Sequence, residues 1–155
     1  MDKEIRIYRE LLTPEECKEI LLFSKEHFEE DKRARYGWHA RTNRNLHFEN
    51  RIKEKITPIS PLNPFYISWI NVSEYEDNRS LELHIDERSD YTLCITLTDE
   101  YEGGNFIIEN EKYKTQKGDC ILFDGHHLKH GVEPVTKGYR ASLNIWIKKG
   151  NKSFL

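Results

Sequence analysis

The sequence predicts an α+β domain that is mainly β, with a jelly-roll core and N-terminal helices packed on one side. Three observations predict this fold. A chain of 155 residues is a usual length for one domain, and 12% aromatic residues argue against disorder. Residues 1–56 carry helical signals, whereas residues 65–148 consist of short β-branched and aromatic runs separated by turns. Helices followed by strands are typical of α+β proteins, and many short strands favour a sandwich or barrel.

The helical segment is expected to contain two helices. Thr13 suits an N-cap, Pro14 the first helical position, and Glu16 can complete a capping box. Phe48–Ile56 is a second candidate helix, and it ends at a connector, 57–64, that contains three prolines. The first helix is supported by residues at helical spacing, namely Cys17, Ile20, Leu21, Ser24 and Phe28.

The strand-rich segment is expected to form the jelly roll, the small all-β core that leaves a ligand-sized mouth. Turn clusters at 76–78, 102–104 and 117–119 separate its runs. Strands are predicted at 65–72, 81–85, 91–98, 105–109, 119–123 and 141–148. Together with the helical segment, residues 1–56, this core makes one domain of residues 1–155.

Charge and cysteine content exclude some functions. A net charge of −3 excludes a globally basic nucleic-acid binder, but residues 32–55 hold eight basic residues against two acidic ones. This segment is either a solvated surface or a positive rim that attracts an anionic substrate. Three cysteines at unrelated spacings fit reduced thiols. With no signal-like start and no apolar run of about 18–20 residues, we expect a cytoplasmic protein without a membrane partner.

Two clusters could bind a metal ion. His84 and Asp86 lie two residues apart, so on a strand they would face the same side. A second cluster, Asp124–His130, contains three histidines, and any of them could supply a third ligand. Two histidines and one carboxylate, with the other positions open, are typical of non-heme Fe(II) oxygenases.

The last strand has an unusually polar face. Arg140, Ser142, Asn144 and Trp146 alternate with apolar residues and would share one side of the strand. A guanidinium can pair with a carboxylate through two hydrogen bonds, and a serine hydroxyl can add another. The polar face therefore indicates that the core holds a ligand with a carboxylate.

Taken together, these segments resemble the iron- and 2-oxoglutarate-dependent dioxygenases, nearest to the prolyl 4-hydroxylase-like branch. No single segment is decisive, but their order and spacing are similar to those of the family. The matching segments are Tyr75, His84–Asp86, the Gly-Gly turn in 98–106, the run 117–123, and the segment from His130 to Arg140.

The resemblance implies a double-stranded β-helix fold and a catalytic iron bound by His84, Asp86 and His130. His130 is preferred to the other two histidines of its cluster because it lies ten residues before Arg140. Fe(II), 2-oxoglutarate as co-substrate and O2 are the implied cofactors, and ascorbate could support them. A carboxylate at Asp86 predicts hydroxylation, because related halogenases have Gly or Ala there.

The resemblance also implies a 2-oxoglutarate site. Arg140 would hold the 5-carboxylate of 2-oxoglutarate, helped by Tyr75 or Ser142. Thr96 is a lesser candidate on the inward side of its strand.

The implied reaction is hydroxylation of a C–H bond in a prolyl peptide or protein, or in a small amino-acid-like molecule. It would be coupled to decarboxylation of 2-oxoglutarate to succinate. Candidate substrate-binding residues are Trp146, Trp38 and Arg41, although Trp146 could simply pack in the core. The segment around Trp38 and Arg41 could equally be a lid.

Two alternatives remain open. The same core could act on nucleic acid through the basic segment 32–55. The fold could also be a non-catalytic jelly-roll metal-binding protein, although structural zinc sites usually have four protein ligands.

Overall fold

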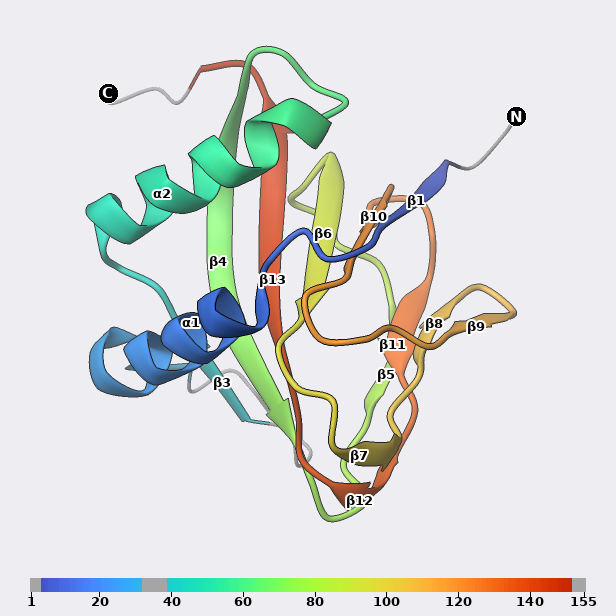
Figure 1. The fold of residues 1–155 in the computed structure, drawn as a ribbon. Helices are drawn as coiled ribbons and strands as arrows, with labels where there is room; N and C mark the ends of the chain where they lie inside the picture. The colour runs from blue at the N-terminus through green and yellow to red at the C-terminus, as the bar shows by residue number, and fades with distance from the viewer. Residues whose placement is uncertain (1–3, 32–38, 152–155) are drawn as a thin grey trace.

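The computed structural model describes residues 4–31 and 39–151, which form two β-sheets with helices on one side (Figure 1). Both helices lie beside strands β4 and β13 of the larger sheet. The strands of the smaller sheet gather on the opposite side of the molecule. The predicted fold class, mainly β with a jelly-roll core and helices on one side, is confirmed.

Helix α1 (Pro14–His27) begins as its sequence predicts. The Thr13 side chain accepts a hydrogen bond from the Glu16 backbone, and the Glu16 side chain accepts one from the Thr13 backbone. Helix α2 (Leu46–Ile56) begins two residues earlier than expected, because Asn45 caps it by accepting from the Phe48 backbone. A short 3₁₀ turn, Thr57–Ile59, follows α2. Neither described helix has the length and apolar character that crossing a membrane requires.

The described strands pair antiparallel throughout. The larger sheet has the order β1 (Ile5–Tyr8), β10 (Cys120–Phe123), β6 (Tyr91–Thr96), β13 (Arg140–Lys149), β4 (Phe65–Tyr75), β3 (His39–Thr42) and β2 (Glu29–Glu30). The smaller sheet has the order β5 (Leu81–His84), β11 (His130–Val132), β8 (Phe106–Ile108) and β9 (Glu111–Tyr113). Strands β7 (Tyr101–Gly103) and β12 (Val135–Gly138) form a separate pair.

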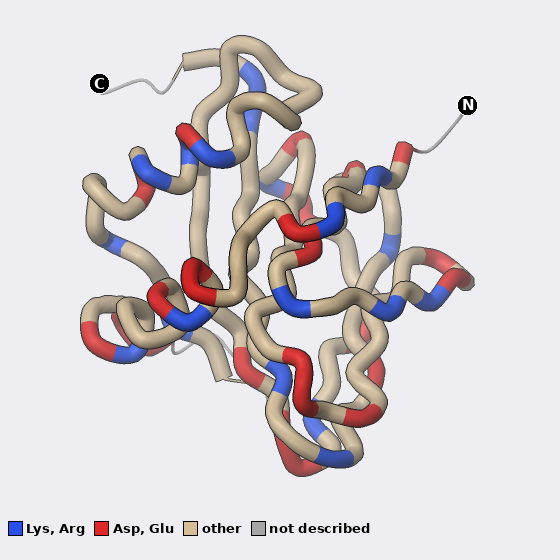
Figure 2. Tube along the Cα trace, viewed as in Figure 1, with Lys and Arg blue, Asp and Glu red and all other residues tan. Residues whose placement is uncertain are grey.

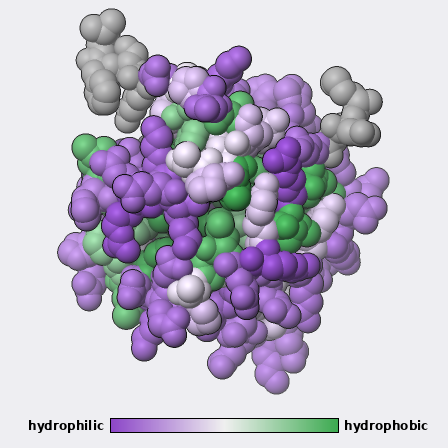
Figure 3. Space-filling view, turned by 45° about the horizontal axis from the view of Figure 1, so that its top comes forward, coloured by the Kyte–Doolittle hydropathy of each residue, from purple (hydrophilic) through white to green (hydrophobic). Residues whose placement is uncertain are grey.

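Two hydrophobic clusters hold these layers together. The first joins the helices to one face of the larger sheet, and its members include Cys17, Ile20, Phe48, Ile52, Ile70, Leu93 and Leu143. The second joins the other face to the smaller sheet, and its members include Phe106, Ile108, Phe123, Leu128 and Val132. On the outer face shown in Figure 3, hydrophilic side chains surround a central area where hydrophobic residues are exposed. Because the second cluster lies between the two sheets, the jelly-roll interior is on the face of the larger sheet that the helices do not cover.

The expectation that residues 1–56 are only helical is wrong, because β1, β2 and β3 belong to this segment of the chain. Strand β1 pairs with β10, and β3 pairs with β4. These strands are two to four residues long, so they carry too little periodicity to be recognised from sequence. The six strands expected after residue 64 are all present, with ends that differ by at most three residues.

Candidate metal and anion site

Two strands of the smaller sheet bring the candidate metal ligands together. His84 ends β5 and His130 begins β11, and the two residues are direct partners in the antiparallel register. Their ring centroids lie 4.4 Å apart. Asp86 follows β5, and its backbone N–H donates to the Gly125 carbonyl at 2.8 Å. Of the three histidines in the cluster 124–130, the sheet register therefore places His130 beside His84.

The three ligand groups converge on one point. The Nε2 atom of His130 lies 3.0 Å from Asp86 Oδ2, and Nε2 of His84 lies 3.4 Å from Asp86 Oδ1. One ligand atom from each residue lies within 4.8 Å of the others. The opposite ring nitrogens, Nδ1, face backbone carbonyls at 2.8 Å, of Glu82 for His84 and of Leu128 for His130. When a metal ion is bound, a proton on each Nδ1 would leave the Nε2 lone pair free to ligate it.

Hydrogen bonding keeps the carboxylate of this group ionised. Burial alone would raise the pKa of Asp86, but hydrogen bonds from His130, His84 and Thr92 outweigh burial and hold it well below its usual range. For His84 the directions are reversed. Burial alone would lower its pKa, but hydrogen bonds to Asp86 and to the Glu82 carbonyl outweigh burial and raise the pKa. Two imidazoles and an ionised carboxylate are the ligands that non-heme Fe(II) takes with open positions, so these residues fit that metal.

Thr92 and Gly125 hold Asp86 in place. Thr92 Oγ1 donates to Asp86 Oδ2 at 2.7 Å. A Cβ atom at Gly125 would lie 2.3 Å from Thr92 Oγ1 and 2.7 Å from Asp86 Oδ2, so no other residue fits there without displacing the carboxylate. Gly125 therefore has a steric reason to be glycine.

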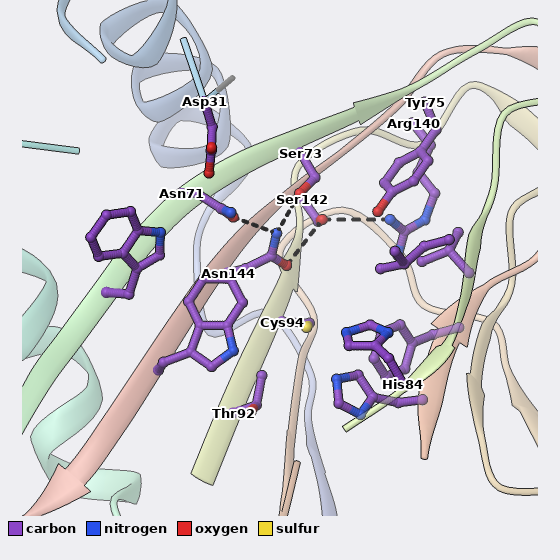
Figure 4. A pocket seen from close by; sticks show the side chains of 16 residues that line it. Asp31, Asn71, Ser73, Tyr75, His84, Thr92, Cys94, Arg140, Ser142 and Asn144 are labelled. Atoms are coloured by element: carbon purple, nitrogen blue, oxygen red, sulfur yellow. Dashed lines mark hydrogen bonds between the residues drawn. The ribbon is translucent and has the colours of Figure 1, made fainter. Parts of the chain in front are cut away.

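A cavity of about 310 Å³ opens beside the histidines, between the two sheets (Figure 4). This volume is at the lower end of the range for small-ligand sites. Its described lining consists of Asp31, Trp69, Asn71, Ser73, Tyr75, Leu81, His84, Thr92, Cys94, Phe106, His130, Val132, Arg140, Ser142, Asn144 and Trp146.

Arg140 forms the cationic end of this cavity. It is 2% exposed, and its Nε has no hydrogen-bond partner among the described residues. Its Nη1 donates to Ser142 Oγ at 3.5 Å, and its guanidinium lies 5.6 Å from the centroid of the Tyr75 ring. No ion pair to Arg140 occurs in the described part of the chain. A buried cation without a counter-ion indicates that this end of the cavity accommodates an anion.

A hydrogen-bond network continues from Arg140 along the cavity wall (Figure 4). Ser142 Oγ donates to Asn144 Oδ1 at 3.2 Å. Asn144 Nδ2 donates to Asn71 Oδ1 and to Ser73 Oγ, each at 2.8 Å. This network explains the polar face of β13, since its polar side chains are satisfied by those of β4.

Two further groups on the cavity wall stay protonated at neutral pH. Burial raises the pKa of Tyr75 to about 12 and the pKa of Cys94 to about 12. The Tyr75 phenol can therefore donate a hydrogen bond to an anion beside Arg140. Cys94 keeps its thiol proton in the metal-free protein, and it does not belong to the group of converging ligand atoms.

Of the other site residues predicted from the sequence, some line the cavity and others lie outside its described lining. Trp146 lines the cavity, as expected of a residue on the polar face. Thr96 is buried outside the described lining of the cavity, and its hydroxyl pairs with that of Thr115. Arg41 forms an ion pair with Glu74 and is also absent from that lining. Trp38 lies outside the described residues.

The other histidines of the 124–130 cluster point elsewhere. His127 is exposed, and its Nδ1 lies 2.8 Å from Asp124 Oδ2. His126 Nδ1 lies 3.3 Å from the backbone carbonyl of Asp86, not from its carboxylate. Neither residue belongs to the group of converging ligand atoms, which contains His130.

Besides the expected Tyr75, strand β4 contributes three residues to the cavity that were not predicted from the sequence: Trp69, Asn71 and Ser73. Trp69, Asn71, Ser73 and Tyr75 alternate along β4 and face the same side. The sequence pattern could have predicted this polar face of β4, because the same alternation of polar and aromatic residues was recognised in β13.

Ion pairs neutralise much of the basic segment over its described residues, 39–55. Arg41 pairs with Glu74, Arg44 with Glu29 at 3.5 Å, and Lys55 with Glu16 at 3.2 Å. Along the trace, basic and acidic positions are interspersed (Figure 2). Among the lysines and arginines at 39–55, only Arg51 and Lys53 form no ion pair with a described residue, so this part of the segment offers a phosphate backbone few unpaired cations.

Comparison with known proteins identifies the family and the fold of this chain. The family model described as "2OG-Fe(II) oxygenase superfamily" matches residues 70–148. A PKHD-type hydroxylase from Idiomarina loihiensis is 25% identical over 111 residues, which cover 64% of this chain and 50% of the relative. The chain thus spans about half the length of this curated relative.

Two solved structures share the fold. A viral collagen prolyl hydroxylase from Paramecium bursaria Chlorella virus-1, solved as its 2OG complex, has a TM-score of 0.75 and 17% identity, covering 96% of this chain and 97% of that one. HygX from Streptomyces hygroscopicus, solved with nickel and 2-oxoglutarate, has a TM-score of 0.77 and 10% identity, covering 95% and 83%.

Proposed function

This chain belongs to the 2OG-Fe(II) oxygenase superfamily, and we propose that it hydroxylates a C–H bond of a prolyl peptide or a small amino-acid-like substrate. The reaction would consume 2-oxoglutarate and O2 and release succinate and CO2. The observation that carries this proposal is a buried Arg140, without an ion-pair partner among residues 4–31 and 39–151, in the same cavity as two candidate iron ligands, His84 and His130.

The proposed iron ligands and the proposed anion-binding residues lie at different ends of the cavity. His84, Asp86 and His130 would hold Fe(II) and would leave its other positions open to ligands. Arg140 would bind the 5-carboxylate of 2-oxoglutarate, and the Tyr75 phenol would donate to the same anion. When bound, iron, 2-oxoglutarate and O2 together supply the oxidation that converts the substrate C–H bond into a C–O–H group.

The protein itself contributes orientation and a sheltered environment. Each histidine keeps its proton on Nδ1 through a backbone carbonyl, so neither ring can rotate without losing a hydrogen bond. Thr92 and Gly125 fix the direction of the Asp86 carboxylate. Buried apolar rings of Phe106 and Phe123 pack around His130 and keep bulk water from that side.

The test is an anaerobic titration of the protein with Fe(II) and 2-oxoglutarate, followed through the weak visible charge-transfer band of the chelate. We expect a band in the wild type, its loss in His84→Ala, and a need for much more 2-oxoglutarate in Arg140→Ala. His127→Ala is the matched control, because it removes an exposed histidine of the neighbouring cluster and should leave the band unchanged.

A second step separates catalysis from binding alone. Succinate release under O2 is then measured with peptide and amino-acid substrates. A folded, iron-loaded protein that shows no band would refute the oxygenase proposal and favour a non-catalytic metal-binding jelly roll.

A further inference from the structure

A second concave surface lies on the outer side of the candidate metal site. It has a volume of about 620 Å³, and Asp86 lines it from the metal side. Trp69 and Trp146 line both this surface and the inner cavity, so the two adjoin at these residues. We call it the outer groove; its described lining is Tyr66, Ser68, Trp69, Ile85, Asp86, Glu87, Arg88, Trp146 and Lys148.

The sheet register explains why the groove adjoins the metal site. Trp146 is the direct partner of Thr92 on β6, and the Thr92 hydroxyl donates to Asp86. Beyond Trp146, the next side chain on the same face of β13 is Lys148, which lies opposite Tyr66 on β4. A register shift between these pairs leaves Ser68 as an extra residue in β4, and such bulges redirect neighbouring side chains.

The same face of β13 therefore has a cation at each end. Arg140 is buried in the inner cavity, whereas Lys148 lies in the outer groove with the aromatic side chain of Trp146 between them. Eight residues of extended strand separate the two cations, which corresponds to about 26 Å. An anion at Lys148 would thus belong to a different molecule from an anion at Arg140.

The described lining of the groove holds two cationic side chains, Arg88 and Lys148, and two anionic ones, Asp86 and Glu87. Arg88 and Lys148 form no ion pair in the described part of the chain. Glu87 opposes them, and Asp86 is committed to His84 and His130. Unpaired cations beside tryptophan rings suit a ligand that joins an apolar or ring-shaped part to an anionic group.

We propose that the outer groove binds the substrate, and that the substrate carries a carboxylate, held by Arg88 and Lys148, next to the apolar part packed on Trp69 and Trp146. This inference rests on the proposed function, because it takes the groove to deliver a C–H bond to the metal site. The carboxylate could come from a free amino acid or from an acidic side chain in a peptide.

The experiment measures binding without turnover. The protein is loaded with Zn(II), which is redox-inactive, and with saturating 2-oxoglutarate, whose binding is recorded first by calorimetry. Two matched pairs of probes are then titrated: N-acetylproline against N-acetylprolinamide, and acetyl-Pro-Glu-amide against acetyl-Pro-Gln-amide. The first pair reports a free carboxylate, and the second reports an acidic side chain.

We expect the acid to bind about fivefold more tightly than the amide in at least one pair, which corresponds to two partly exposed ion pairs. The preference should decrease in Arg88→Met and in Lys148→Met and disappear in the double variant. Lys149→Met is the control, because Lys149 is exposed and adjacent in sequence but on the opposite face of β13. It should keep the preference.

The outcomes separate the two proposals. Equal binding of acid and amide, absence of binding by every probe, or a preference that survives the double variant would overturn the groove proposal while leaving the proposed function intact. Failure to bind 2-oxoglutarate in the first step would instead overturn the proposed function. Thermal unfolding of each variant confirms that it is folded.

Discussion

Replacing Arg140 by methionine should stabilise the ligand-free protein while removing its response to 2-oxoglutarate. Methionine keeps an unbranched stem of similar reach, so the cavity wall stays packed, but the buried charge is removed. In the described structure Arg140 has no counter-ion, one long hydrogen bond of 3.5 Å to Ser142, and an Nε without a partner.

The magnitude follows from these contacts. An unpaired buried ion costs several kcal/mol, and water in a cavity of about 310 Å³ offsets part of this cost. The substitution also removes the interaction of the guanidinium with the Tyr75 ring, 5.6 Å away, which reduces the gain in stability by about 1 kcal/mol. We therefore expect the free energy of unfolding to rise by about 1–2 kcal/mol.

The assay is urea unfolding of the Zn(II)-loaded protein with and without 2-oxoglutarate. At 100 times its dissociation constant, the ligand should stabilise the wild type by about 2.7 kcal/mol and Arg140→Met by almost nothing. The control is Arg41→Met. Because Arg41 is paired with Glu74, its loss should destabilise the protein and preserve the full ligand response. A less stable Arg140→Met that still responds to 2-oxoglutarate would show that the reasoning about this buried cation is wrong.

Three more changes test the supporting structure. Gly125→Ala should weaken Zn(II) binding by about 10–100-fold in a competition titration, since its Cβ would collide with Thr92 and Asp86; unchanged affinity would contradict the proposed steric role. Thr13→Ala should lower the free energy of unfolding by about 1 kcal/mol through loss of the α1 cap, with no change in 2-oxoglutarate binding. Hydrogen bonds outweigh burial and lower the pKa of Asp119, so its contribution to stability is present above about pH 4 and is lost as the pH falls further. Asp119→Asn should accordingly be less stable than the wild type at pH 7, and urea unfolding should show the difference narrowing toward pH 2.

The sequence predicted the features of the site that depend on local spacing. The spacing of two residues predicted that His84 and Asp86 meet, although β5 ends at His84 and Asp86 follows it, and strand alternation predicted the polar face of β13 that carries Arg140. The capping residues of α1 were recognisable because all of their partners lie within one helical turn. Such contacts join residues close in the chain, so their geometry follows from the backbone conformation of one element.

Other features depend on residues far apart in the chain. Thr96 was expected to contact 2-oxoglutarate, but its hydroxyl meets Thr115, which the sheet brings to it from 19 positions away. Arg41 was expected to bind substrate, but β3 pairs with β4 and places the guanidinium beside Glu74. Neither partner can be identified from spacing, because a loop of any conformation could separate the two residues.

By itself, the sequence determined which residues could chelate a metal, where α1 begins, and which face of the last strand is polar. The tertiary structure decided which histidine of the 124–130 cluster lies beside His84, that Arg140 has no counter-ion in the described chain, and that the outer groove adjoins Asp86. The physical reason is that strand register and burial arise from packing between distant segments. Local backbone preferences determine the direction of a side chain, but the packing of the sheets determines which residues it contacts.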